Sequence, residues 1–211
     1  MNSLVPVFSM FRIIVLCSLL LTFSAHSIVE VNGEYGLSTQ KYGITRENKI
    51  QSTTIGGAMA VYLFDTTAIE LNYGQTETIT SETDVLTIDS TYDLIGQRNN
   101  VLIYSYGIGI RQAFASRRSR FRPSLSIGYA RQFIRDSTAA TFRNKDTNTS
   151  FIVNGTTSKR RDDSVFGSFN LELRLTQRVS LRGSVKTIFK AFEFNRAQDN
   201  IRYLVGFSWY L

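Results

Sequence analysis

Cysteine and histidine are almost absent from this chain of 211 residues, which contains one of each. Both residues, Cys17 and His26, fall within the first 27 positions. This segment has the pattern of a cleavable signal peptide, with Arg12 as its only charge, an apolar run from Ile13 to Leu21, and small residues at 25–27. We therefore predict a signal peptide at residues 1–27 and a single mature domain at 28–211.

Two other interpretations of the leader are weaker. A retained membrane anchor is disfavoured because the apolar run is shorter than the roughly 20 residues that a spanning helix needs. Lipid attachment at Cys17 is disfavoured because the small residues expected before a lipidated cysteine are missing. Without the leader, the chain has no disulfide, no thiol nucleophile and no histidine base.

Signals for catalysis and for cofactors are also lacking. The sequence has no glycine-rich phosphate loop, and without cysteine or histidine a zinc site is not expected. Carboxylate pairs such as Asp162-Asp163, or Glu70 and Glu172, are conceivable acid–base groups, and loop carboxylates could hold calcium, but no spacing favours either. We predict no catalytic residue, no metal, no cofactor and no nucleic-acid partner; the net charge of +7 favours an anionic surface.

After residue 28 the chain lacks helical periodicity, and apolar residues alternate with small or polar ones. The clearest run is 102–111, in which Leu102, Tyr104 and Ile108 alternate with Ser105, Gly107 and Gly109. The register is ambiguous only around 57–64. The pattern predicts an all-β domain with eight strands near 28–42, 50–64, 67–80, 93–115, 121–136, 163–176, 179–192 and 200–211.

The predicted connections alternate between short and long. The links near 65–66, 116–120 and 177–178 are short, whereas those near 43–49, 81–92, 137–162 and 193–199 are longer and polar. Short turns at one end and long loops at the other are typical of an antiparallel up-and-down transmembrane barrel.

A secreted soluble barrel of the lipocalin kind is the main structural alternative, and a sandwich with a solvated charged face is another. A soluble barrel keeps its apolar face inside, whereas a membrane barrel turns it towards lipid. Here the apolar face is bulky, and the opposite face combines small residues with charges that we expect to pair inside the lumen: Glu30, Glu34, Glu70, Arg111, Glu172, Arg174, Arg182, Lys186 and Arg202.

The last ten residues, Arg202 to Leu211, resemble the terminal strand that the barrel-assembly machinery recognises in outer-membrane proteins. The matching positions are Gly206, Phe207, Trp209 and Leu211, although the family usually ends in an aromatic residue. With the leader and the eight runs, the chain resembles the small eight-stranded outer-membrane barrels, the OmpX-like and OmpA-transmembrane-domain-like group. This resemblance implies a bacterial outer-membrane location and contact with outer-membrane lipid.

The predicted connections between the strands contain two basic clusters and one sequence that is typical of a tight turn. Arg117 to Arg122 falls on a predicted periplasmic turn, where it is either a phospholipid contact or a solvated loop. Lys159, Arg160 and Arg161 fall on the longest outer loop and are candidates for contacting lipopolysaccharide phosphates, again with a solvated loop as the alternative. Asn154-Gly155 predicts a tight hairpin that would lift a ribbon above the membrane.

The function that these features favour is non-enzymatic. We expect a structural or surface-interaction (adhesin-like) role, with a surface partner binding the outer loops or an exposed strand edge. The alternatives are a narrow channel for small solutes and, less favoured, a lipid-modifying enzyme that works without histidine.

Overall fold

The computed structural model describes residues 28–42, 48–83, 85–155, 157–190 and 200–211, so the predicted signal peptide lies outside the described residues. In this part of the chain no helix is long and apolar enough to cross a membrane.

Ten antiparallel strands make up the described chain, and eight of them close into a ring. The ring order is β1-β2-β3-β5-β6-β8-β9-β10, and β10 pairs back onto β1. The predicted eight-stranded up-and-down barrel is therefore confirmed. The ring strands are β1 (Val29–Tyr42), β2 (Asn48–Tyr62), β3 (Thr67–Glu82), β5 (Tyr92–Ala113), β6 (Phe121–Asn144), β8 (Ser158–Arg174), β9 (Val179–Lys190) and β10 (Arg202–Tyr210).

Two short strands lie outside the ring. β4 (Leu86–Thr87) pairs with the start of β5, and β7 (Ser150–Asn154) pairs with the end of β6. β7 has a partner because β6 runs on to Asn144 instead of ending near 136; β8 also starts earlier than predicted, at Ser158 instead of 163.

The predicted Asn154-Gly155 hairpin is wrong. Gly155 donates its N–H to the Thr138 carbonyl at 2.7 Å, so this dipeptide stays paired with β6. The turn lies nearer the tip, where Asn148 has a φ of 52° and the Asn144 side chain accepts from the N–H groups of Asp146 and Thr147. Asparagine tolerates this left-handed backbone, so the turn needs no glycine.

The side chains are distributed in the reverse of a soluble barrel, with apolar residues facing outward and small or polar residues facing the lumen. On β10 the outward residues Tyr203, Val205, Phe207 and Trp209 are each more than half exposed, whereas Ser208, on the opposite face, is fully buried. On β2 the ambiguous register is settled, with Met59 outward and Tyr62 buried at 2% exposure. A strand of nine residues such as β10 matches the roughly 9–11 that a tilted transmembrane strand needs. The fold is therefore that of a transmembrane barrel with a polar interior.

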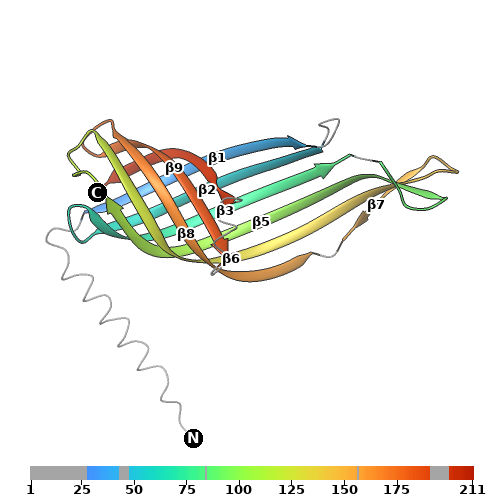
Figure 1. Ribbon diagram of the computed structural model, residues 1–211, viewed down its shortest axis with the longest axis horizontal. Coiled ribbons are helices and arrows are strands. Elements are labelled where there is room, and N and C mark those ends of the chain that lie inside the picture. The colour runs from blue at the N-terminus through green and yellow to red at the C-terminus, as the bar shows by residue number, and fades with distance from the viewer. Residues whose placement is uncertain (1–27, 43–47, 84, 156, 191–199) are drawn as a thin grey trace, which may run out of the picture.

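The barrel wall is tall on one side. Figure 1 shows β1, β2, β3, β5 and β6 running well beyond β9, and the tips of β5, β6 and β7 extend furthest from the end that carries the C-terminus. The short turns 63–66, 114–120 and 175–178 lie at the C-terminal end of the barrel.

Candidate functional site

The lumen is occupied by a charged network centred on Arg111 of β5. Its Nη1 lies 2.6 Å from Glu30 Oε1 and 3.8 Å from Glu172 Oε1, and its Nε pairs with Glu70. Arg111 and Glu30 are both fully buried. A buried charge is tolerated only when it is paired and hydrogen-bonded, and three carboxylates around one guanidinium meet that requirement.

Arg182 of β9 ties a second set of carboxylates to this centre. Its Nη1 lies 3.1 Å from Glu30 Oε1 and 3.3 Å from Glu172 Oε1, and its Nε lies 2.8 Å from Glu34 Oε1. β9 is thereby joined through the lumen to β1, with which it makes no backbone pairing among the described residues.

Hydroxyl groups give each of the four carboxylates a further donor. Tyr62 donates to Glu30 and Tyr210 donates to Glu172, each at 2.6 Å. Ser126 donates to Glu70 at 3.0 Å, and Ser184 donates to Glu34 at 2.8 Å. The carboxylates are therefore engaged by fixed donors, and none of them lies free as an acid–base group.

Sequence reasoning missed three members of this network. Arg122, assigned to a turn, is 3% exposed; its Nη1 lies 3.7 Å from Glu172 Oε2 and its guanidinium lies 4.8 Å from the ring centre of Tyr62. Tyr62 and Tyr210 were not identified either. The signal for Arg122 was present, because it shares its alternation phase with Ser124 and Ser126 on the polar face of β6.

Three predicted lumen residues lie outside this network. Arg174 donates to the carbonyls of Thr176, Arg117 and Gln177 at the turn end, and no ion pair joins it to Glu172. Lys186 donates to Asn72 and lies 5.6 Å from the Phe166 ring centre, and Arg202 donates to Thr76.

A second layer above the charges is apolar. Phe166 is fully buried and packs with Ala130 and Ile188. Its ring lies on Gly107, Gly109 and Gly128, where a Cβ atom at Gly107 would meet the ring at 3.1 Å. Ionic and aromatic layers together leave the barrel interior filled by side chains, as expected for eight strands.

The most exposed structure is an arm, which we define as β4, residues 92–100 of β5, residues 137–144 of β6, and β7. One face of the arm is apolar: the rings of Phe142 and Phe151 stack at 5.7 Å, and Tyr92 meets Phe151 edge-on at 5.8 Å. Asp93 lies on the other face, 3.2 Å from Lys145 and 3.4 Å from Arg143.

Both ends of the sheet lie in the arm. β4 and β7 are the terminal strands in the sheet order, so within the described chain each has one unpaired edge. On β7, Phe151, Ile152 and Val153 are 45%, 64% and 47% exposed. The arm is a structural element with free edges and exposed apolar side chains.

Hydrogen bonding from Lys145, Thr87 and Arg143 outweighs the effect of burial on Asp93, which acts in the opposite direction. The pKa of Asp93 is therefore lowered below its ordinary value of 3.8. The carboxylate stays ionised at neutral pH and links the tips of β5 and β6.

The three residues predicted to contact lipopolysaccharide, Lys159, Arg160 and Arg161, line a cavity of about 770 Å³ on the barrel wall. We call this cavity the basic–aromatic pocket. Cross-strand pairing places Arg161 beside Phe133 and Lys159 beside Arg135. Arg160 lies 3.5 Å from Asp162. Arg135 was missed because only strand pairing brings it to the cluster. The lining is Tyr104, Tyr106, Phe133, Ile134, Arg135, Lys159, Arg160 and Arg161.

The assembly candidates lie at the closing seam. Phe207, Trp209 and Leu211 face outward at 58%, 53% and 73% exposure. Gly206 faces inward opposite Glu34, and a Cβ atom there would collide with the Gly33 carbonyl of β1. Position 206 therefore accommodates no residue larger than glycine unless the backbone of the seam moves.

No family model and no curated protein matches the chain. Among solved structures, the N-terminal barrel domain of OprF from Pseudomonas aeruginosa aligns at 14% identity and a TM-score of 0.49, over 87% of this chain and 97% of that one. The attachment invasion locus protein Ail of Yersinia pestis, solved with the heparin analogue sucrose octasulfate, aligns at 10% identity and 0.46, over 88% and 98%. Neisserial surface protein A aligns at 11% and 0.40, over 87% and 96%. The predicted resemblance to small eight-stranded outer-membrane barrels is confirmed for the fold, for which the strand pairing is the evidence.

Proposed function

We propose that this protein is a non-enzymatic barrel of the bacterial outer membrane that presents the arm at the cell surface for binding to a partner protein. The arm carries this proposal, because a sheet that rises beyond the barrel with two unpaired edges invites pairing with a partner's strand. The lumen supports it, because the ionic network and Phe166 occupy the interior that a channel would need.

Orientation follows the rule for membrane barrels, in which short turns face the periplasm and long connections face outside. The turns 63–66, 114–120 and 175–178 then lie in the periplasm. The predicted export through a signal peptide and the assembly signal at the closing strand are parts of the same proposal.

A matched pair of substitutions tests the use of the β7 edge. Ile152→Lys places a charge on the edge strand, and Thr141→Lys places the same charge on the same face of β6, directly opposite Ile152 and paired on both sides. We expect Ile152→Lys to lower adherence of a non-adherent host strain to immobilised matrix and plasma proteins by about tenfold. Thr141→Lys should retain adherence.

Shortening the arm is the second test. Replacing residues 141–152 by Asn-Gly joins Ala140 to its cross-strand partner Val153 and keeps residues 121–140 of β6 paired with β5 and β8. Adherence should fall to that of the empty strain while heat-modifiable migration persists. Unchanged adherence of this variant would contradict the proposal.

Lipopolysaccharide is the second proposed partner, and the basic–aromatic pocket favours it. The rings of Tyr73, Tyr106 and Phe133 form an outward row with centroid separations of 5.3 and 6.0 Å, as in the aromatic girdle at a membrane interface. Arg135, Lys159 and Arg161 lie beside that row, where guanidinium and ammonium groups suit lipid phosphates. Changing all three to Gln should reduce lipopolysaccharide co-purification; equal recovery would contradict the contact.

A further inference from the structure

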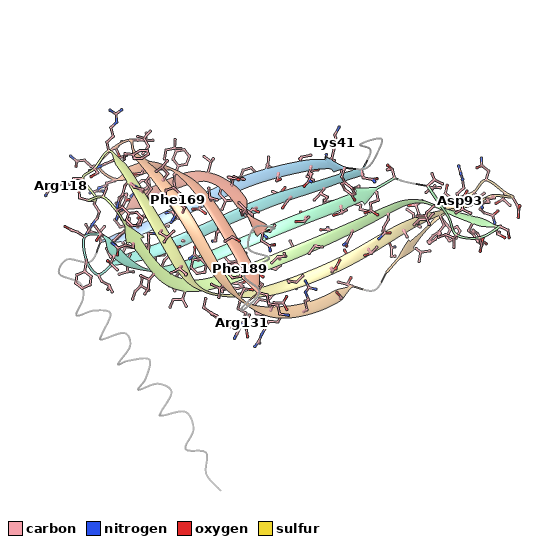
Figure 2. The ribbon with its side chains drawn as sticks, viewed as in Figure 1. Lys41, Asp93, Arg118, Arg131, Phe169 and Phe189 are labelled. Atoms are coloured by element: carbon pink, nitrogen blue, oxygen red, sulfur yellow. The ribbon has the colours of Figure 1, made fainter. Side chains whose placement is uncertain are left out.

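Arginine side chains gather at the end of the barrel opposite the arm. Arg117, Arg118 and Arg120 lie in the turn 114–120, Arg178 lies in the turn 175–178, and Arg174 ends β8. In the three short turns the only acidic residue is Asp65. Figure 2 shows Arg118 at this end and Lys41 towards the other.

These arginines surround a cavity of about 900 Å³ in the mouth of the barrel, which we call the arginine basin. Arg117, Arg118, Arg174 and Arg178 line it, together with Tyr62 and Tyr210. Its volume falls in the range of about 300–1,000 Å³ that is usual for ligand sites. Residues of all three short turns line the basin, including the exposed Phe64 and Asp65, whereas Phe114 and Phe121 are exposed outside it at 63% and 54%.

Two of the four guanidinium groups are held in place before any ligand binds. Arg174 donates to three backbone carbonyls at 3.0–3.3 Å. Arg117 lies 5.1 Å from the Tyr62 ring centre and pairs with Asp65 at 3.0 Å. Its Nη1 is buried and has no hydrogen-bond acceptor among the described residues. The protein therefore leaves part of the hydrogen-bonding capacity of the Arg117 guanidinium unused.

The other two guanidinium groups are free to bind. Arg118 and Arg178 are exposed, and within residues 28–42, 48–83, 85–155, 157–190 and 200–211 no ion pair is found for either. Fixed positive charges concentrate the field in a concave site, and mobile guanidinium forks can close on a carboxylate in bidentate fashion.

We propose that the arginine basin binds an acidic peptide segment on the periplasmic side of the membrane. Its central position disfavours bilayer lipid, which meets the outer wall of the barrel. Its lining of Tyr62, Leu63 and Leu211 beside the arginines suits a chain that carries apolar groups as well as carboxylates. We assign this segment to a periplasmic protein; the peptide stems of the cell wall, which present the same carboxylate chemistry, are the alternative that the test separates.

Peptide binding to the purified chain in neutral detergent micelles tests this inference independently of the arm. A fluorescein-labelled hexaglutamate peptide represents the protein tail, soluble muropeptides represent the cell wall, and hexaserine is the neutral control. We expect saturable binding of hexaglutamate and none of hexaserine. Binding of muropeptides without binding of hexaglutamate would overturn the assignment to a protein segment. The Kd should rise about tenfold or more for Arg118→Gln/Arg178→Gln.

Lys41→Gln/Lys49→Gln is the matched control, because it removes two charges at the far end of the barrel, where Lys41 pairs with Lys49 across β1 and β2. Its Kd should equal that of the unmodified protein, and heat-modifiable migration should show both variants folded. Equal losses in the two variants, or no preference for acidic probes over hexaserine, would overturn the proposal. Complete displacement of the peptide by phosphatidylglycerol vesicles would overturn it in favour of a lipid contact.

Discussion

At the scale of single residues, the molecule is organised by charges that only the barrel interior brings together. Arg111, Arg122 and Arg182 face four glutamates, and tyrosine and serine hydroxyls add further hydrogen bonds to the carboxylates. Such a network gives little net stability compared with a well-packed apolar interior. Removing one partner, however, leaves a buried charge without a counter-charge, which is strongly destabilising.

Replacing Arg111 with methionine tests that asymmetry. The change leaves Glu30 and Glu70 without their closest cation, and we expect the free energy of unfolding to fall by about 3–5 kcal/mol. Urea unfolding in lipid vesicles, followed through the fluorescence of Trp209, the only tryptophan, measures this. Arg120→Gln, an exposed turn position, should change stability by less than about 0.5 kcal/mol. Equal effects of the two changes would show that the network is not a stability determinant.

At the scale of elements, the strands were the most predictable part of the protein. Alternation located all eight ring strands because each has one face towards lipid and one towards the lumen. The positions of the turns were predicted less well, because local residue preference was the only guide to them. Asn154-Gly155 has the local preference for a hairpin, yet pairing with β6 continues through it, since each additional ladder bond favours extending two strands already side by side.

The seam between β1 and β10 gives a prediction for an element. Gly206→Ala should weaken barrel closure, because the added methyl group collides with the Gly33 carbonyl; overpacking of this kind costs about 1–3 kcal/mol. Gly183→Ala on neighbouring β9 is the matched control, since its Cβ atom would meet nothing within 4 Å. Heat-modifiable gel migration and urea midpoints compare the two variants. Indistinguishable variants would show that close approach is not what requires glycine at this seam.

At the scale of the whole molecule, the two ends of the barrel differ in structure and in charge. One end extends into the arm, with apolar and charged faces and free edges; the other is a rim of short turns with an excess of arginine. Between them the lumen is filled by an ionic layer and by Phe166. This arrangement favours binding at the two ends over transport between them.

Planar-bilayer recording tests that interpretation. The purified protein should give no steady single-channel currents under conditions in which a porin conducts, because the guanidinium–carboxylate layer blocks the axis of the barrel. Reproducible unitary conductance would instead support the channel alternative and would require the network to open.

The sequence by itself determined the all-β class, the number of ring strands and the face that meets lipid, because these depend on alternation within each strand. Alternation also placed most of the charges of the lumen network on the polar face, although Arg122 was assigned to a turn. Only the tertiary structure decided which charges meet, since Glu30 and Arg182 are 152 residues apart and become neighbours through ring closure and strand stagger. The arm and the arginine basin were decided in the same way, because an unpaired edge and a cavity between turns are properties of several strands together.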